Sequence, residues 1–129
     1  MNNPNILKDD ALVVKRAKSF GPAIRGLWLF LKTTPNAWIQ LAVMAVAIFF
    51  GFYCDIPKSD WLALIFASGL VIVTEALNTA IEIDINLTSA SYHPYARDTK
   101  DVAAGAVLIS VLIAVVVGLF IFLPYLLKI

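Results

Sequence analysis

Three long apolar stretches, separated by short polar segments, predict three membrane-spanning helices. They cover residues 37–53, 61–83 and 102–127, and the first contains only one polar side chain beyond its ends, Gln40. At 1.5 Å per residue the shortest stretch is about 25 Å long, a marginal crossing of a hydrocarbon core about 30 Å thick. The last stretch carries no charge over its 26 residues.

A fourth, amphipathic pattern precedes the spans. Between about residues 11 and 32, apolar side chains recur at helical spacing, and basic side chains supply much of the other surface. Such a helix is suited to lying in the headgroup plane of a bilayer. We expect a break or kink at Gly21–Pro22, because proline removes a backbone donor and its ring crowds the preceding turn.

The polar segments are expected to be connections. Residues 54–60 predict a tight turn, and residues 84–100 predict a polar loop broken at Pro94. The whole chain, 1–129, is therefore predicted to be one all-α membrane domain, a surface helix followed by three transmembrane helices. Its hydrophobic content of 60% agrees with an integral membrane protein. No cleavable signal peptide is expected, because residues 1–36 are polar and charged.

A polar stripe interrupts the second apolar stretch near its end. Glu75, Asn78 and Glu82 share one helical face, with the two carboxylates about 10 Å apart along the axis. Ionisable groups near membrane depth cost about 2.5–3.5 kcal/mol each, so the stripe is a candidate functional site. The alternative is that these side chains lie beyond the membrane boundary and are solvated by headgroups.

The distribution of basic residues predicts the orientation. Six precede the first span, two lie in the 84–100 segment and one lies in the 54–60 turn. The positive-inside rule then places the N-terminus and the 84–100 segment in the cytoplasm, with the polar stripe on the same side. The net charge of +1 gives no indication of nucleic-acid binding.

The polar groups on the cytoplasmic side suit phosphoryl transfer. Carboxylate and amide oxygens are the ligands that Mg²⁺ prefers, basic side chains neutralise a polyphosphate, and a deeper carboxylate can take a proton from a lipid hydroxyl. The acidic and basic members are Glu75, Glu82, Asp84, Asp98, Asp101, Arg97 and Lys100. The chain has no P-loop. A small transporter or proton channel is the competing interpretation, since intramembrane glutamates also mark ion paths.

Two motifs resemble a known family. Residues 75–82 read E-A-L-N-T-A-I-E, and residues 93–108 read H-P-x-A-R-x-x-K-D-x-A-A-G-A-V-L. Together they resemble the signature of the small prokaryotic membrane lipid kinases, the diacylglycerol kinase and undecaprenol kinase family. Residues 19–26 and 35–40 resemble the N-terminal blocks of that family.

The resemblance implies a homotrimer in the bacterial inner membrane that transfers the γ-phosphate of MgATP to a lipid hydroxyl. Glu75 would be the general base, Asn78 would shape the active site, and Glu82 would be a metal ligand that also contacts the nucleotide. Lys100 and Asp101 would contact the nucleotide phosphates and their surroundings, as would Lys15.

Two positions depart from the family pattern. Thr34 occupies the usual place of a second metal-binding glutamate, and Asn86 stands where an aspartate is usual. Loss of a ligand would weaken or alter Mg²⁺ binding, or would mark a catalytically weak or inactive member. The motifs look more like the undecaprenol kinase branch, so undecaprenol is the expected substrate and diacylglycerol the alternative.

Overall fold

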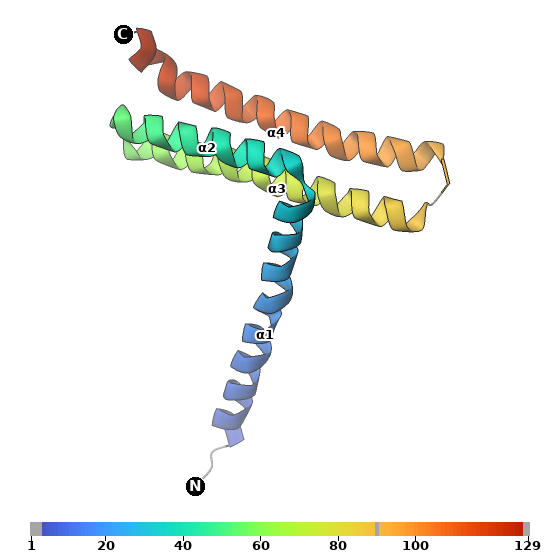
Figure 1. Cartoon of the computed structure of the whole chain (residues 1–129). Coiled ribbons are helices and arrows are strands. Elements are labelled where there is room, and N and C mark those ends of the chain that lie inside the picture. The colour runs from blue at the N-terminus through green and yellow to red at the C-terminus, as the bar shows by residue number, and fades with distance from the viewer. Residues whose placement is uncertain (1–3, 90, 128–129) are drawn as a thin grey trace. The chain divides into compact units, whose positions relative to one another are not determined.

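The computed structural model describes residues 4–89 and 91–127, and the chain divides into two compact units, Met1–Pro35 and Asn36–Ile129. The elements of the described residues are all helices (Figure 1). They are α1 (Pro4–Thr33), α2 (Pro35–Tyr53), α3 (Lys58–Thr88) and α4 (Pro94–Leu127). Helices α2, α3 and α4 are each long and apolar enough to cross a membrane. The predicted fold of one helix followed by three spans is confirmed.

The first unit is the helix α1, whose side chains are described at Lys18 and from Phe20 onward. Its apolar residues Phe20, Ile24 and Trp28 recur one turn apart, and each exposes 60% or more of its surface. Lys32 lies one turn after Trp28, with its Nζ 4.8 Å from the centre of the indole ring. This arrangement of exposed apolar and basic side chains is typical of a helix at a membrane surface.

Of the break or kink expected at Gly21–Pro22, the break is wrong, because α1 continues through Pro22 without interruption, and the kink stays a prediction. A proline in a helix normally clashes with the Cβ of the preceding residue. That residue is Gly21, which has no Cβ, so part of the steric conflict is absent. The helix also begins earlier than the predicted residue 11, at Pro4.

The turn between α2 and α3 is shorter than predicted, because α3 begins at Lys58 rather than Trp61. Asp55 takes a positive φ of 50°, a conformation that aspartate tolerates better than most residues. Ile56 is then buried at 4% exposure, in a cluster with Leu64 of α3 and Ile121 of α4. The turn therefore packs against α3 and α4 at one end of the second unit.

Gly51 allows α2 and α3 to approach each other at this turn. A Cβ at residue 51 would lie 2.7 Å from Cη2 of Trp61 and 3.3 Å from Cδ1 of Ile56. Gly51→Ala is therefore expected to lower the free energy of unfolding by about 1–3 kcal/mol, the usual cost of overpacking. Thermal unfolding in detergent measures this loss. Gly69→Ala is the matched control, because its Cβ would meet nothing within 4 Å, and equal melting temperatures for both variants would contradict the prediction.

The predicted polar loop over residues 84–100 is wrong. Helix α3 continues to Thr88 and α4 begins at Pro94, so residues 89–93 connect them. Proline is well accepted at the first position of a helix, since its missing N–H would be unpaired there anyway. The His93 Nδ1 accepts a hydrogen bond of 3.3 Å from the Tyr95 backbone N–H and helps to cap α4.

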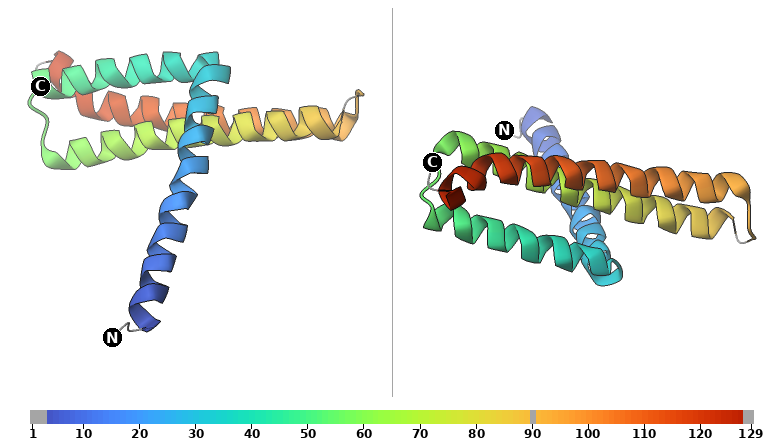
Figure 2. Two further views of the ribbon diagram at one scale, coloured as in Figure 1. Left: turned by 60° about the horizontal axis from the view of Figure 1, so that its bottom comes forward. Right: turned by 90° about the horizontal axis from the view of Figure 1, so that it is seen from above.

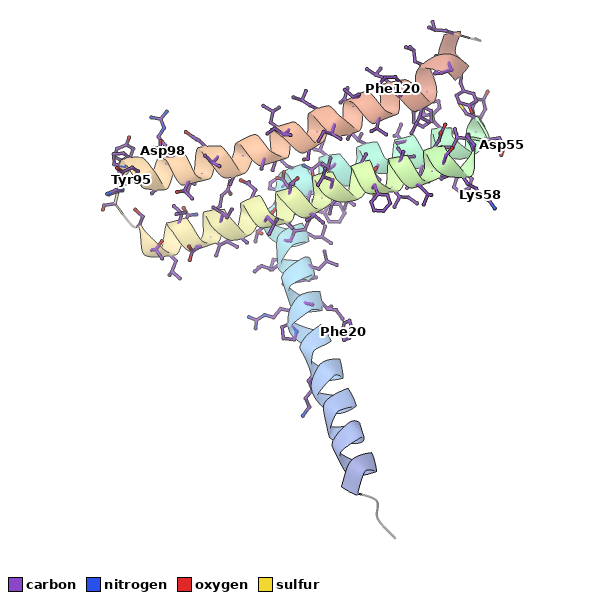
Figure 3. All side chains as sticks on the ribbon, turned by 180° about the vertical axis from the view of Figure 1, so that it is seen from behind. Phe20, Asp55, Lys58, Tyr95, Asp98 and Phe120 are labelled. Carbon is purple, nitrogen blue, oxygen red and sulfur yellow. The ribbon has the colours of Figure 1, made fainter. Side chains whose placement is uncertain are left out.

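Helices α3 and α4 run antiparallel and side by side, and both extend past the start of α2 (Figures 1 and 2). A hydrogen bond of 2.8 Å joins the hydroxyls of Thr74 and Ser110 across this pair. Ser110 is 2% exposed, and it also donates to the Val107 carbonyl. Figure 3 shows Asp55 and Lys58 at one end of the unit and Tyr95 and Asp98 at the other. The polar stripe lies between Thr74 and the second of these ends.

Candidate functional site

Glu75 is a buried carboxylate on α3, with 3% of its surface exposed. It lies one residue after Thr74, where α3 packs against α4. Its Oε2 accepts a hydrogen bond of 2.9 Å from Nε2 of Gln40 on α2. Its backbone carbonyl accepts a bond of 3.0 Å from the Thr79 hydroxyl one turn later. The side chain is therefore held between two helices instead of pointing into solvent.

Asn78 and Glu82 continue the stripe toward the end of α3. The Asn78 Nδ2 donates a hydrogen bond of 3.2 Å to Glu82 Oε1. Asn78 is buried and Glu82 is exposed, so the stripe changes from buried to open over two turns. The Asn78 Oδ1 is buried and has no hydrogen-bond partner among the described residues. An amide oxygen in this state is available to a cation or to a donor on a substrate.

Lys100, in the second turn of α4, is a basic residue at this open end. Its Nζ donates a hydrogen bond of 2.6 Å to Oδ1 of Asn86, which lies one turn beyond Glu82 on α3. Packing of α3 against α4 therefore brings Lys100 to the outer end of the stripe. Asp101, in contrast, forms an exposed ion pair of 3.6 Å with Arg97 on its own helix.

The two remaining predicted residues belong to the first unit. Lys15 lies on α1 but outside the described side chains. Thr34 follows the last residue of α1, is buried, and donates its backbone N–H to the Phe30 carbonyl at 3.0 Å. Their roles stay predictions from the resemblance.

The donor set for a metal is small. In the part of the chain that the structure describes, no group of three or more His, Cys, Asp or Glu side chains could hold a metal ion. Glu82 and the Asn78 amide oxygen together offer one carboxylate and one neutral oxygen. This set fits Mg²⁺ that arrives with a nucleotide, because Mg²⁺ commonly binds through one or two carboxylates and substrate phosphates.

Gln40 is the site residue to which the sequence assigned no role. The sequence shows Gln40 as the lone polar side chain within the apolar stretch 37–53. It does not show that Gln40 contacts Glu75 on α3. Gln40 also lines an apolar groove of about 610 Å³ between α2, α3 and α4. The groove extends along the helices to Cys54 and Phe122 near the opposite end, with Leu64 and Val71 on its α3 wall.

A family model described as prokaryotic diacylglycerol kinase matches residues 21–122. The undecaprenol kinase of Bacillus subtilis is 37% identical over 107 residues, which cover 83% of this chain and 87% of the relative. The diacylglycerol kinase of Escherichia coli K12 is 28% identical over 105 residues, 81% of this chain and 83% of the relative. The diacylglycerol kinase of Synechocystis is 48% identical over 66 residues, 50% of this chain and 38% of the relative.

The matched region contains α2, α3 and nearly all of α4, and with them Gln40, the polar stripe and Lys100. The family match favours a kinase over a transporter as the activity of this chain. The chain belongs to the prokaryotic diacylglycerol kinase family and is a lipid kinase.

Proposed function

We propose that this protein transfers the γ-phosphate of MgATP to the hydroxyl of undecaprenol. The observation that carries the proposal is the buried Glu75 carboxylate, hydrogen-bonded to a side chain that lines the apolar groove. A lipid chain in the groove would bring its terminal hydroxyl to the carboxylate. The phosphates would lie toward the open end of the stripe, near Glu82 and Lys100.

Glu75 is the general base in this proposal. It accepts the proton of the lipid hydroxyl as the hydroxyl oxygen bonds to the γ-phosphorus. The bond from that phosphorus to the bridging oxygen breaks, and ADP leaves with the bonding electron pair. Because the transition state of phosphoryl transfer is loose, positioning and electrostatic stabilisation supply most of the catalysis.

The nucleotide would be bound through charge and through its metal ion. Lys100 supplies a positive charge at the open end of the stripe, and Glu82 with the Asn78 amide oxygen would hold Mg²⁺. Bound Mg²⁺ neutralises phosphate charge. Asp101 would contact the nucleotide phosphates and their surroundings, and the family resemblance adds Lys15 as a further basic nucleotide contact.

The membrane setting of the proposal rests on charge and resemblance. The excess of Lys and Arg before the first span favours a cytoplasmic N-terminus and active site in the bacterial inner membrane. The homotrimer comes from the family resemblance.

Undecaprenol is proposed because the motifs look more like the undecaprenol kinase branch, and because identity over most of both lengths is 37% with the undecaprenol kinase of Bacillus subtilis and 28% with the diacylglycerol kinase of Escherichia coli K12. The test is a competition assay with purified protein, labelled ATP and Mg²⁺, in micelles that hold equal amounts of undecaprenol and diacylglycerol. Most of the label is expected on undecaprenol. Preferential labelling of diacylglycerol would reject the substrate preference, and labelling of neither alcohol would reject the kinase function.

The metal role of Glu82 predicts a change in Mg²⁺ dependence. Glu82→Gln keeps the shape of the side chain and an acceptor for Asn78, but it removes the charge that attracts the cation. We expect the Mg²⁺ concentration for half-maximal activity to rise about tenfold or more, as for loss of a charged interaction. A titration of activity against Mg²⁺ at fixed ATP measures it.

Asp84→Asn is the matched control, because Asp84 lies about 200° around the helix from Glu82. A separate variant, Thr34→Glu, restores the carboxylate that the family usually has at this position. It is expected to lower the Mg²⁺ concentration for half-maximal activity. Equal Mg²⁺ curves for Glu82→Gln and Asp84→Asn would remove Glu82 from the metal site.

A further inference from the structure

Gln40 is a polar side chain in a place where one is costly. It lies on α2 about 8 Å from the helix start, in a span that is otherwise apolar up to its end. Gln40 is half-buried with its Oε1 buried, and such an amide makes hydrogen bonds to offset the loss of water. Its Nε2 does so with Glu75 Oε2 at 2.9 Å, and this is a contact between α2 and α3.

The oxygen of the Gln40 amide, unlike its nitrogen, lacks a hydrogen-bond partner among the described residues. This atom, Oε1, is buried. The orientation of the amide is therefore set by Glu75 alone. An ionised carboxylate accepts hydrogen bonds only, so it selects the orientation in which Nε2 faces it.

We propose that Gln40 is the positioning residue for Glu75. By donating to Oε2, Gln40 fixes the carboxylate plane and leaves Oε1 as the oxygen that receives the proton of the lipid hydroxyl. The inference rests on the proposed function, in which Glu75 is the base. Gln40 itself forms and breaks no bond in the reaction.

An amide suits both protonation states of the base. Once Glu75 holds the proton on Oε1, its Oε2 is the carbonyl oxygen of a carboxylic acid and still accepts the hydrogen bond from Gln40 Nε2. Gln40 therefore supports the carboxylate before proton transfer and the carboxylic acid after it.

A double-mutant cycle separates positioning from a merely structural role. Gln40→Met removes donor and acceptor at nearly the same size, and it is made in the wild type and in Glu75→Gln. In the wild type we expect kcat to fall about 10-fold to 100-fold, with KM for ATP within about twofold. In Glu75→Gln we expect Gln40→Met to change kcat by less than about twofold, because the base on which Gln40 acts is already absent.

Ile48→Met is the matched control for the new side chain, since Ile48 lies on the same helix and does not line the groove. Its kcat is expected to equal that of the wild type. If Gln40→Met does not fold, Gln40→Leu replaces it in the same cycle. That variant also loses both donor and acceptor and is expected to show the same non-additivity.

An equal loss of kcat in both backgrounds would overturn the proposal, because Gln40 would then act independently of Glu75. Unchanged kcat for Gln40→Met in the wild type would overturn it as well. Failure of the proposed function is recognised separately, since the wild type would then label no lipid.

Discussion

Glu75→Gln is expected to lower kcat by about 10²-fold or more, because the amide cannot take up the proton of the lipid hydroxyl. The substitution is nearly isosteric, and the new carbonyl oxygen can still accept the hydrogen bond from Gln40. Binding of ATP should change little, since the phosphates are placed at the open end of the stripe. Steady-state kinetics with labelled ATP at saturating lipid give both constants.

Asp60→Asn provides the comparison, because Asp60 is a carboxylate in the first turn of the same helix, near its opposite end. It should keep wild-type turnover. If Glu75→Gln turns over at the wild-type rate, Glu75 is not the base. If only KM for the lipid rises, the carboxylate binds the hydroxyl without accepting its proton.

Lys100→Met is expected to raise KM for ATP by about 10-fold to 100-fold, through loss of a charged contact to the phosphates. The hydrogen bond from Lys100 to Asn86 allows the charge of Lys100 to be tested by a second variant, at Asn86. Asn86 is neutral, so it holds the ammonium group without compensating its charge. Asn86→Asp would compensate that charge and should raise KM for ATP in the same direction, by a smaller factor.

The control is Lys58→Met, because Lys58 lies at the opposite end of the unit from Tyr95 and Asp98 (Figure 3). Measurements at several salt concentrations add a check, since a charge interaction weakens as salt screens it. A KM for ATP that is unchanged in Lys100→Met would place the nucleotide elsewhere. A lower KM in Asn86→Asp would show that Lys100 is only oriented, and not weakened, by its partner.

Hydropathy predicted the interiors of the helices better than their ends. The apolar runs located all three spans, because burial in lipid requires long uncharged segments. Hydropathy did not show that α3 continues to Thr88 or that α4 begins at Pro94. A helix that projects into water has no hydropathy signal, and its polar residues look like a loop. The same limit explains why α1 was expected to start later than Pro4.

The site was predicted in part for a similar reason. Helical spacing placed Glu75, Asn78 and Glu82 on one face, and the Asn78–Glu82 hydrogen bond agrees with that geometry. Contacts between helices need the packing of the chain. The bonds from Gln40 to Glu75 and from Lys100 to Asn86 each join residues of different helices. No periodicity within one helix predicts such a pair.

The central claim is that a buried carboxylate of this chain drives transfer of phosphate from ATP to a membrane alcohol. It is tested most directly by purified protein in liposomes that contain undecaprenol, with γ-labelled ATP and Mg²⁺. The predicted result is one labelled lipid phosphate for each ADP formed, and a loss of both products in Glu75→Gln. ADP formation without labelled lipid, or equal labelling by the wild type and Glu75→Gln, would contradict the account.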